Sequence, residues 1–369
     1  MSRGSNQVLV NVLQDPTQVQ DYGLREWDLL VRQARRADLL ATVSGLIHDA
    51  GFDQTIPTDV RRHFDAHLTL VHANQTAIMW EVAQIYRTLE NISVQPILLK
   101  GAAYLLAGLP VSTGRIFNDI DILVPRVNID EVEQALIESG WSSGHMDAYD
   151  QNYYRNWMHE LPPLQHMRRG TALDVHHTIL PETGLLKPDI QKLMDAAITL
   201  SVRDDYSVRV LAPVDMVLHS ATHLFHEGEF NHGLRDLFDL HRLLIEFSKA
   251  PDFWEKLVMR AQEVGLVQPL YYATRYTKKI LQTPVPDYVL RKFQDISSVG
   301  LTSWLMDYSY ERTLVSDHVT CRKPFTGLAE YLLFIRSHYL RMPMHLLIPH
   351  LIHKSLKREA ENSKEENVN

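Results

Sequence analysis

The stretch from residue 96 to residue 124 constrains the fold and the chemistry of this chain more than any other. It begins with a short apolar segment, Ile97 to Leu99, and continues through Gly101 into a short helical pattern. A second apolar segment then carries Asp119 and Asp121. Because side chains alternate between the two faces of a strand, residues two apart point the same way. The two carboxylates are therefore predicted to project together from a strand whose other face is apolar.

This arrangement indicates a metal site next to a phosphate site. Two adjacent carboxylates repel each other, so both stay ionised only when a cation lies between them. Carboxylate oxygens suit Mg²⁺, with substrate phosphates completing its coordination. Just upstream, Lys100, Gly101 and the first amides of the following helix provide an anion-binding turn. Carboxylates for a metal that face a phosphate cradle indicate phosphoryl or nucleotidyl transfer.

The same residues carry a family resemblance. Leu-Lys-Gly-Ala-Ala, followed by Arg115-x-x-x-Asp119-Ile-Asp121, resembles the signature of the polymerase-β-like nucleotidyltransferase superfamily. The chain is most similar to a bacterial branch of that superfamily described as uncharacterised nucleotidyltransferases. The motif resemblance covers about residues 96–180, and the flanking helical regions resemble that branch in layout only. It implies an enzyme that moves NMP from an NTP, with ATP favoured, to an unidentified hydroxyl-bearing acceptor and releases pyrophosphate.

In that superfamily a glycine turn holds the nucleotide triphosphate, and the matching residues here are Lys100, Gly101 and Ala102. The superfamily usually has Gly-Ser or Gly-Gly at this turn, so this chain lacks a serine hydroxyl that would contact phosphate. A larger share of phosphate binding is therefore expected from Lys100 and Arg115, since arginine's planar fork suits phosphate oxygens. The alternative is a structural ion pair of these cations with the strand carboxylates.

The resemblance also implies a third carboxylate on a later strand. The matching position is Asp174, which with Asp119 and Asp121 would bind one or two Mg²⁺ ions and serve in catalysis. Asp174 and His176 share one face of a strand that follows a predicted hairpin turn at residues 168–170. His176 and a later histidine, His223, are candidates for acceptor contacts or for supporting the metal ligands.

Two other functions stay open. Because the serine of the turn is missing, one alternative function is a non-catalytic nucleotide sensor or adaptor whose helical regions recruit a partner. A helical face rich in histidine and acid suggests a metal-dependent hydrolase, although the order of its residues does not match the zinc-protease motif. That face comprises His219, His223, His226, Glu227, Asp236 and Asp239.

Composition narrows the partners. Lys and Arg number 37 against 45 Asp and Glu, which gives a net charge of −8 and argues against a long nucleic acid as partner. The single cysteine excludes an intramolecular disulfide. We expect a cytoplasmic protein because no signal peptide and no membrane-spanning run is found. The oligomeric state is open.

The predicted fold class is α+β, with a small mixed β-sheet nucleotidyltransferase core between two helical regions. The expected division is an N-terminal helical region at 1–93, the core at 94–187, a C-terminal helical region at 188–358 and a disordered tail at 359–369. A long helix is predicted before the core, and residues 201–211 are predicted to form a hairpin or an extended excursion. The basic segment 341–358 is interpreted as a packed terminal helix rather than a membrane-surface helix. The apolar stripe of the long helix comprises Val60, Phe64, Val71, Ile78, Val82, Ile85 and Leu89. Periodicity alone leaves open whether that stripe packs on the core or on another subunit.

Overall fold

The structure is a computed structural model that describes residues 7–144, 153–155, 157–203, 206–226, 228, 230–294, 301–343 and 345–347. The predicted tail at 359–369 and the basic segment from 348 to 358 lie outside the described residues. The strands are β1 (Ile97–Leu99), β2 (Asp119–Leu123), β3 (Trp141–Ser142), β4 (Leu164–His166), β5 (Ala172–His176), β6 (Ile198–Arg203) and β7 (Tyr206–Val210). The α-helices are α1 (Val8–Gln14), α2 (Leu24–Arg36), α3 (Leu40–Asp49), α4 (Thr58–Glu90), α5 (Lys100–Leu106), α6 (Ile129–Glu138), α8 (Ile190–Asp195), α9 (Pro213–His226), α10 (Gly233–Phe247), α11 (Phe253–Glu263), α12 (Val267–Leu281), α13 (Asp287–Gln294), α14 (Leu301–Thr313) and α15 (Thr326–Arg341).

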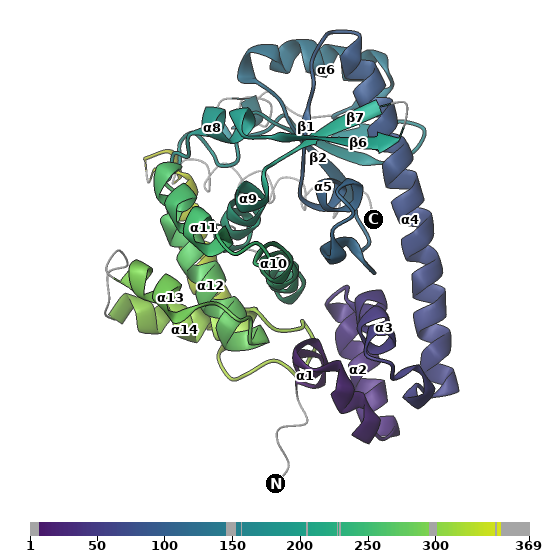
Figure 1. Cartoon of the computed structure of the whole chain (residues 1–369). Coiled ribbons are helices and arrows are strands. Elements are labelled where there is room, and N and C mark those ends of the chain that lie inside the picture. Colours follow the sequence, from purple (N-terminus) through teal and green to yellow (C-terminus); the bar gives the residue numbers. More distant parts are fainter. Residues whose placement is uncertain are drawn as a thin grey trace, which may run out of the picture.

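A mixed sheet lies in the upper part of the molecule as drawn in Figure 1. Within the described residues it has seven strands in the order β3-β4-β5-β2-β1-β7-β6. The pairs β2–β5 and β1–β7 are parallel and the other pairs are antiparallel. The expected α+β class with a small mixed sheet is confirmed. The hairpin predicted near 201–211 is present as β6 and β7, and it joins this sheet, so the sheet extends beyond residue 187.

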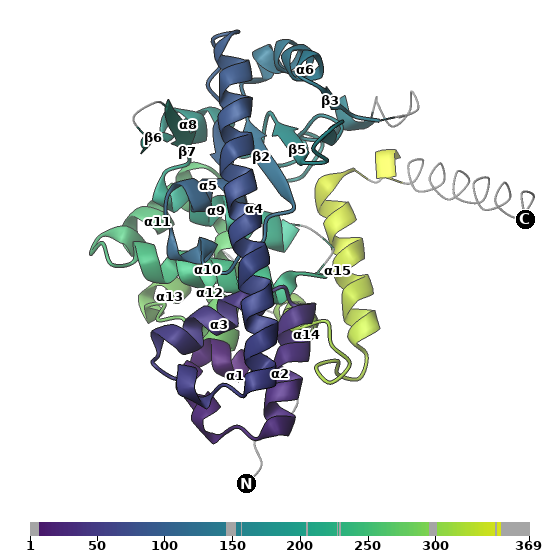
Figure 2. The same ribbon diagram turned by 90° about the vertical axis from the view of Figure 1, so that its right-hand side faces the viewer.

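The long N-terminal helix is confirmed as α4, and all seven predicted apolar residues of its stripe are buried. Figure 2 shows α4 running from the N-terminal helices at the bottom of the view to α6 at the top. It contacts α2 and α3 at one end, α5 in the middle and α6 towards the other end. The partner of the stripe is thus this chain itself, a question that periodicity had left open. The short helix α1 was not predicted.

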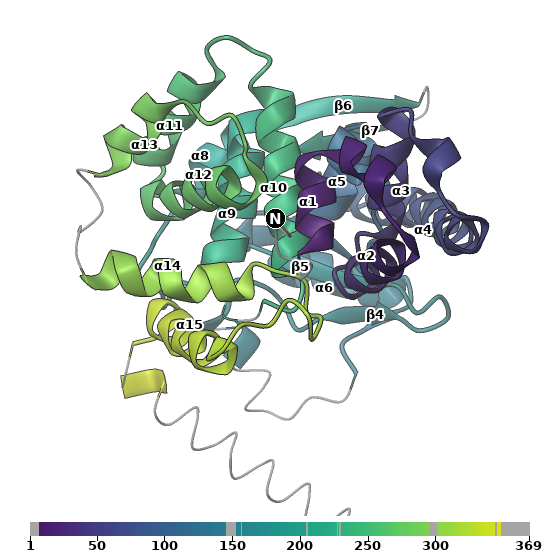
Figure 3. The same ribbon diagram turned by 90° about the horizontal axis from the view of Figure 1, so that it is seen from below.

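The C-terminal helices pack together next to the sheet. Figure 1 shows α9 and α10 between the sheet and the outer helices α11 to α13. Seen from below in Figure 3, α1 to α3 lie on the side of α10 away from α14 and α15. The helices α13 and α14 were not singled out by periodicity. Among the helices of the described ranges, none combines the length and the apolar character that a bilayer crossing requires.

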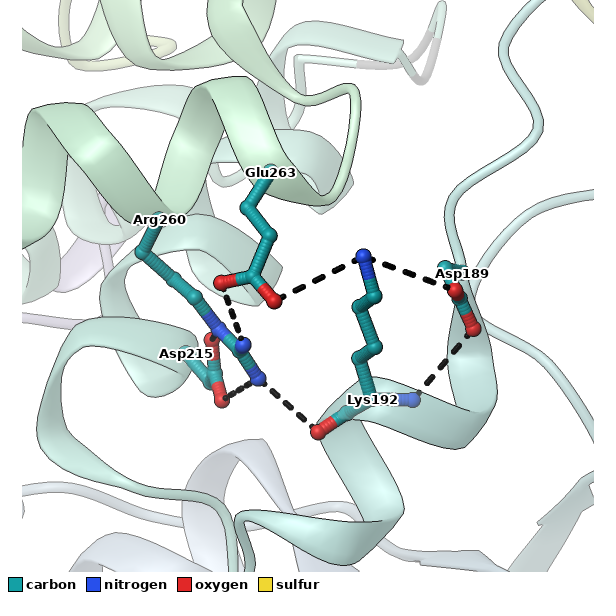
Figure 4. Close-up of polar contacts among 5 residues, drawn as sticks. All are labelled: Asp189, Lys192, Asp215, Arg260 and Glu263. Carbon is teal, nitrogen blue, oxygen red and sulfur yellow. Dashed lines mark hydrogen bonds and ion pairs between the residues drawn. The ribbon is translucent and has the colours of Figure 1, made fainter.

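A buried ion pair fastens α9 to α8 and α11 (Figure 4). The side chain of Asp215 is fully buried, and Arg260 binds both of its carboxylate oxygens, at 2.8 and 3.0 Å. The same guanidinium also donates to the carbonyl oxygen of Lys192 and to Glu263, both at 2.8 Å. Burial raises the pKa of Asp215 against the lowering effect of Arg260, so the arginine compensates a costly buried carboxylate.

We expect Arg260→Lys to lower the free energy of unfolding by about 1–3 kcal/mol, because one ammonium cannot replace the fork that serves Asp215 and a backbone carbonyl. Chemical denaturation measures this difference. Lys256→Met, which removes an exposed ion pair with Asp252 on the same helix, is the control and should leave the midpoint unchanged. Equal stability of the two variants would contradict the account.

Candidate functional site

A cavity of about 190 Å³ opens beside the ends of β1 and β2. Its first wall comes from the core and includes Lys100, Gly101, Arg115, Phe117, Asp119 and Asp121. Its second wall comes from α9, α10 and the turn between them and includes Ser220, His223, His232, Arg235, Asp236 and Asp239. The cavity therefore lies between the predicted catalytic strand and the C-terminal helices.

The turn from β1 into α5 has unusual backbone geometry. Lys100 adopts a φ of +44°, in the left-handed region that non-glycine residues rarely occupy. At Gly101 an added Cβ would lie 2.3 Å from the ring atom Cδ1 of Phe117. No side chain can occupy that space while the ring is there. Glycine is therefore required at this position by the packing of Phe117, a reason that the motif alone does not reveal.

Asp121 is held by two basic side chains. The carboxylate is 2 % exposed, and its Oδ1 accepts hydrogen bonds from Lys100 Nζ at 2.8 Å and from His176 Nε2 at 3.0 Å. Burial by itself would raise the pKa of Asp121, but Lys100 and His176 outweigh burial and hold that pKa well below its usual range. Asp121 therefore stays ionised at neutral pH, and its Oδ1 is occupied by Lys100 and His176.

The other two predicted carboxylates lie around Asp121. Asp174 on β5 is the direct register partner of Asp121 on the parallel strand β2. Burial, followed by the charges of Asp121 and Glu160, raises the pKa of Asp174 to about 7. Asp119 lies on the wall of the cavity. Partial loss of water around its carboxylate, followed by the charge of Asp121, raises the pKa of Asp119. The negative charge of Asp121 therefore disfavours the ionisation of both Asp119 and Asp174.

His176 links Asp121 to a further acid, Glu160, which the sequence analysis did not identify. Its Nδ1 lies 3.3 Å from a carboxylate oxygen of Glu160, and its ring stacks on that of His159 with centroids 5.3 Å apart. Burial would lower the pKa of His176, but the bond to Asp121 and the charge of Glu160 raise it. The imidazole therefore bridges two carboxylates.

Within the described residues, His159, Glu160 and His176 are the group whose ligating atoms lie within 4.8 Å of one another. A shared ion is nevertheless disfavoured there. The two imidazole planes are 24° apart and stacked, whereas a bound ion must lie near the plane of each ring that ligates it. His176 Nε2 is also engaged by Asp121. We interpret this group as a hydrogen-bonded support for Asp121.

Arg115 does not pair with the strand carboxylates. Its Nη2 lies 2.9 Å from Asp239 and 3.8 Å from Asp236, both on α10. Its Nε and Nη1 are buried and have no hydrogen-bond partner within the described residues. Arg235 pairs in turn with Asp236 and with Asp38 at the end of α2. This network joins the loop before β2 to helices from both ends of the chain.

The remaining predicted residues have varied positions. Ala102 is buried in α5 and is not among the residues that line the cavity. Of the histidines on α9, His223 lines the cavity, whereas His219 and His226 are buried in the packing of the helix. Burial and the nearby Lys100 lower the pKa of His219 well below its usual value. Glu227, the acid expected to accompany them, lies outside the described residues.

The cavity presents donors that suit a hard divalent cation. Asp119 and Asp121 line it with carboxylate oxygens, the ligands that Mg²⁺ prefers, whereas Asp174 is not among its lining residues. Within the described residues, these three carboxylates do not form a group whose oxygens all lie within 4.8 Å of one another. Burial, together with the charge of Asp121, raises the pKa of Asp119 and of Asp174, and a cation bound beside them would oppose both effects. The unpartnered donors of Arg115 are similarly suited to an anion.

Comparison with known proteins identifies the family of this chain. A solved structure of an antigenic nucleotidyltransferase-like protein from Paracoccidioides brasiliensis is 13% identical, with a TM-score of 0.32, and the match covers 56% of this chain and 93% of that one. That similarity is too low to carry an argument. No curated protein matches the chain. The model of a family described as "uncharacterised nucleotidyltransferase" matches residues 24–282, which include all seven strands of the sheet and the cavity. The resemblance noted in the sequence is confirmed at the level of the family: the chain belongs to this nucleotidyltransferase family.

Proposed function

We propose that this protein is an Mg²⁺-dependent nucleotidyltransferase that moves NMP from ATP to a hydroxyl-bearing acceptor and releases pyrophosphate. The observation that carries the proposal is the cavity in which Asp119 and Asp121 lie beside the Lys100–Gly101 turn. Carboxylates for a cation and basic groups for phosphate are thus gathered in one concave site.

The nucleotide is proposed to bind with its triphosphate against the turn formed by Lys100, Gly101 and Ala102. In this arrangement Lys100 binds Asp121 and brings positive charge to the phosphate oxygens. Arg115, which is fixed by Asp239 and lines the same cavity, adds a second positive charge for the phosphates. Holding the reactants in place in this way supplies much of the rate enhancement of phosphoryl transfer.

Asp174 is proposed as the base. The oxygen of the acceptor hydroxyl attacks the α-phosphorus, and the bond from that phosphorus to the bridging oxygen of pyrophosphate breaks. Pyrophosphate leaves with the electron pair, and the hydroxyl proton passes to Asp174. A group with a pKa near 7 is well matched to this transfer at neutral pH. Asp119, Asp121 and Asp174 would hold Mg²⁺, which supplies positive charge to the reacting phosphate oxygens.

The direct test is pyrophosphate release by the pure protein with ATP and Mg²⁺. Incubation with labelled ATP and cell extract, followed by mass spectrometry, identifies any acceptor that gains NMP. Release of pyrophosphate with a matching NMP-bearing product supports the proposal. Binding of ATP and Mg²⁺ in calorimetry without turnover across a broad acceptor screen would instead favour the nucleotide sensor. Bound transition metal in the purified protein would favour the hydrolase.

We expect Mg²⁺ to raise the melting temperature more at about pH 8 than at about pH 5. The folded protein keeps a proton on Asp174 up to its pKa of about 7, whereas the unfolded chain loses that proton near the ordinary aspartate pKa of 3.8. Between those values the folded state binds more protons, so this group's contribution to stability falls as pH rises, and a cation reverses that loss. Thermal unfolding with and without Mg²⁺ measures the effect.

Asp174→Asn is the matched variant for this experiment, because it removes the titrating group and keeps the shape of the side chain. In that variant the Mg²⁺-dependent rise should differ less between the two pH values. An equal rise at both pH values in the unmodified protein would contradict a cation bound at Asp174.

A further inference from the structure

Two adjacent amide side chains of α4 bind the backbone of the loop that leads into β2. The Asn74 Nδ2 donates to the carbonyl oxygen of Phe117, and the Phe117 N–H donates to Asn74 Oδ1, both at 2.9 Å. The Gln75 Nε2 donates to the carbonyl oxygens of Ser112 at 2.8 Å and Arg115 at 3.3 Å. We call Asn74 and Gln75 the amide clamp.

The clamp occupies the core-facing stripe of α4. Val71 and Ile78, which are buried members of that stripe, lie seven residues apart, with Asn74 and Gln75 three and four residues after Val71. Positions at this spacing face the same side of a helix. Two amides therefore stand where an apolar side chain would otherwise pack, and their hydrogen bonds go to the loop instead of to solvent.

Phe117, whose backbone Asn74 binds, lies between the phosphate turn and the strand that carries Asp119. Phe117 is buried, and its ring fills the space beside Gly101 at the phosphate turn. Two residues further on, Asp119 begins β2 and faces the cavity. A shift of Phe117 would consequently move the phosphate turn and the metal carboxylates relative to each other.

The loop is also fixed on its other sides, so its position is determined by helices from outside the sheet. An added Cβ at Gly114, whose φ is +74°, would lie 2.4 Å from the backbone nitrogen of Thr42 at the start of α3. From α10, Asp239 binds Arg115 and Arg242 donates to the carbonyl oxygen of Pro110 at 3.0 Å. Figure 2 shows α3 beside the lower part of α4 and α5 higher up along the same helix.

We propose that Asn74 is a positioning residue of the nucleotidyl-transfer site, acting through Phe117, and that the N-terminal helical region is therefore part of the catalytic unit. The side chain of Asn74 offers one donor and one acceptor at the spacing of a backbone amide, so it pairs with both polar groups of Phe117. Leucine offers neither group, and aspartate offers no donor to the Phe117 carbonyl oxygen. The proposal rests on the proposed function for its catalytic readout only.

The test compares Asn74→Leu and Asn74→Asp with the unmodified protein. Thr76→Val on the same helix is the control, because Thr76 is exposed and bonds only the carbonyl oxygen of His72 within α4. Pyrophosphate release gives kcat and KM for ATP. Hydrogen exchange, followed by mass spectrometry, reports the loop at residues 112–119. Thermal unfolding reports the global fold.

We expect both Asn74 variants to stay folded, with kcat reduced about 100-fold, the cost of a displacement near 1 Å, and KM changed much less. Exchange should accelerate at residues 112–119 and stay unchanged in the strands beyond β2. Thr76→Val should match the unmodified protein in all three measurements. Full kcat in a folded Asn74→Leu protein, or unchanged exchange in the loop, would overturn the proposal, as would a loss of activity that only follows unfolding.

Failure of the proposed function is distinguishable from failure of the clamp. An unmodified protein that releases no pyrophosphate with any acceptor contradicts the transferase assignment. The exchange measurement then still decides the clamp, because faster exchange at residues 112–119 in a folded Asn74→Leu protein supports it. Unchanged exchange in that variant rejects it.

Discussion

Asp119→Asn and Asp121→Asn are each expected to reduce pyrophosphate release about 1,000-fold or more, because each removes a charge on which the proposed transition state depends. The two substitutions should differ in their effect on the fold. Asp121 is buried and binds both Lys100 and His176, so its replacement by a neutral amide leaves two basic groups without their countercharge. The Asp121 variant should therefore have a lower melting temperature.

Asp119→Asn is expected to keep or raise the melting temperature. Burial, followed by the charge of Asp121, raises the pKa of Asp119, so the negative charge of Asp119 is unfavourable at this place. Neutralising it removes that repulsion, so activity is lost without loss of stability. Asp252→Asn on the outer helix α11 controls for a general effect of removing a carboxylate and should leave both quantities unchanged. Full activity in both the Asp119 and the Asp121 variants would refute the assignment.

The elements that follow from local pattern were predictable. The stripe of α4 repeats at helical spacing over 33 residues, and the strand that carries Asp119 and Asp121 alternates apolar and acidic residues. Strand parity also predicted that Asp174 and His176 share a face, and their register with Asp121 and Leu123 agrees. In these cases the side chains nearest in sequence determine the environment, so a short window contains the information.

Contacts between distant segments were not predictable in this way. Arg115 was expected to meet phosphate or the strand carboxylates, but its partner Asp239 lies on a helix whose position depends on the whole fold. Periodicity indicated a hairpin near residue 205 without showing that β7 pairs with β1. Glu160 had no signal of its own. The amide clamp had a weak one, since two amides interrupt an otherwise apolar stripe.

The role of Gly101 in the phosphate turn was predictable from the sequence only in part. The motif identified Gly101 as a place where a nucleotide approaches the backbone. The structure adds that Phe117 occupies the space of its missing side chain, with 2.3 Å between the added Cβ and ring atom Cδ1. Such a contact is impossible without movement, and the ring is buried while its backbone is bound by Asn74. The turn itself must then shift.

Gly101→Ala is consequently expected to reduce kcat/KM for pyrophosphate release by about 100-fold or more, the cost of displacing a reacting group by 1 Å. It should also destabilise the fold by about 1–3 kcal/mol through overpacking. Gly327→Ala on α15 is the control, because no atom lies within 4 Å of its added Cβ. That variant should behave as the unmodified protein does.

The double variant Gly101→Ala with Phe117→Ala separates the two explanations for the glycine. Removing the ring creates room for the new methyl group, so the double variant should recover activity and stability relative to Gly101→Ala alone, a positive coupling between neighbouring sites. Phe117→Ala by itself measures the cost of the lost ring. If the double variant is no more active than Gly101→Ala, the methyl group must obstruct the nucleotide directly, and the packing of Phe117 is not the reason for the glycine.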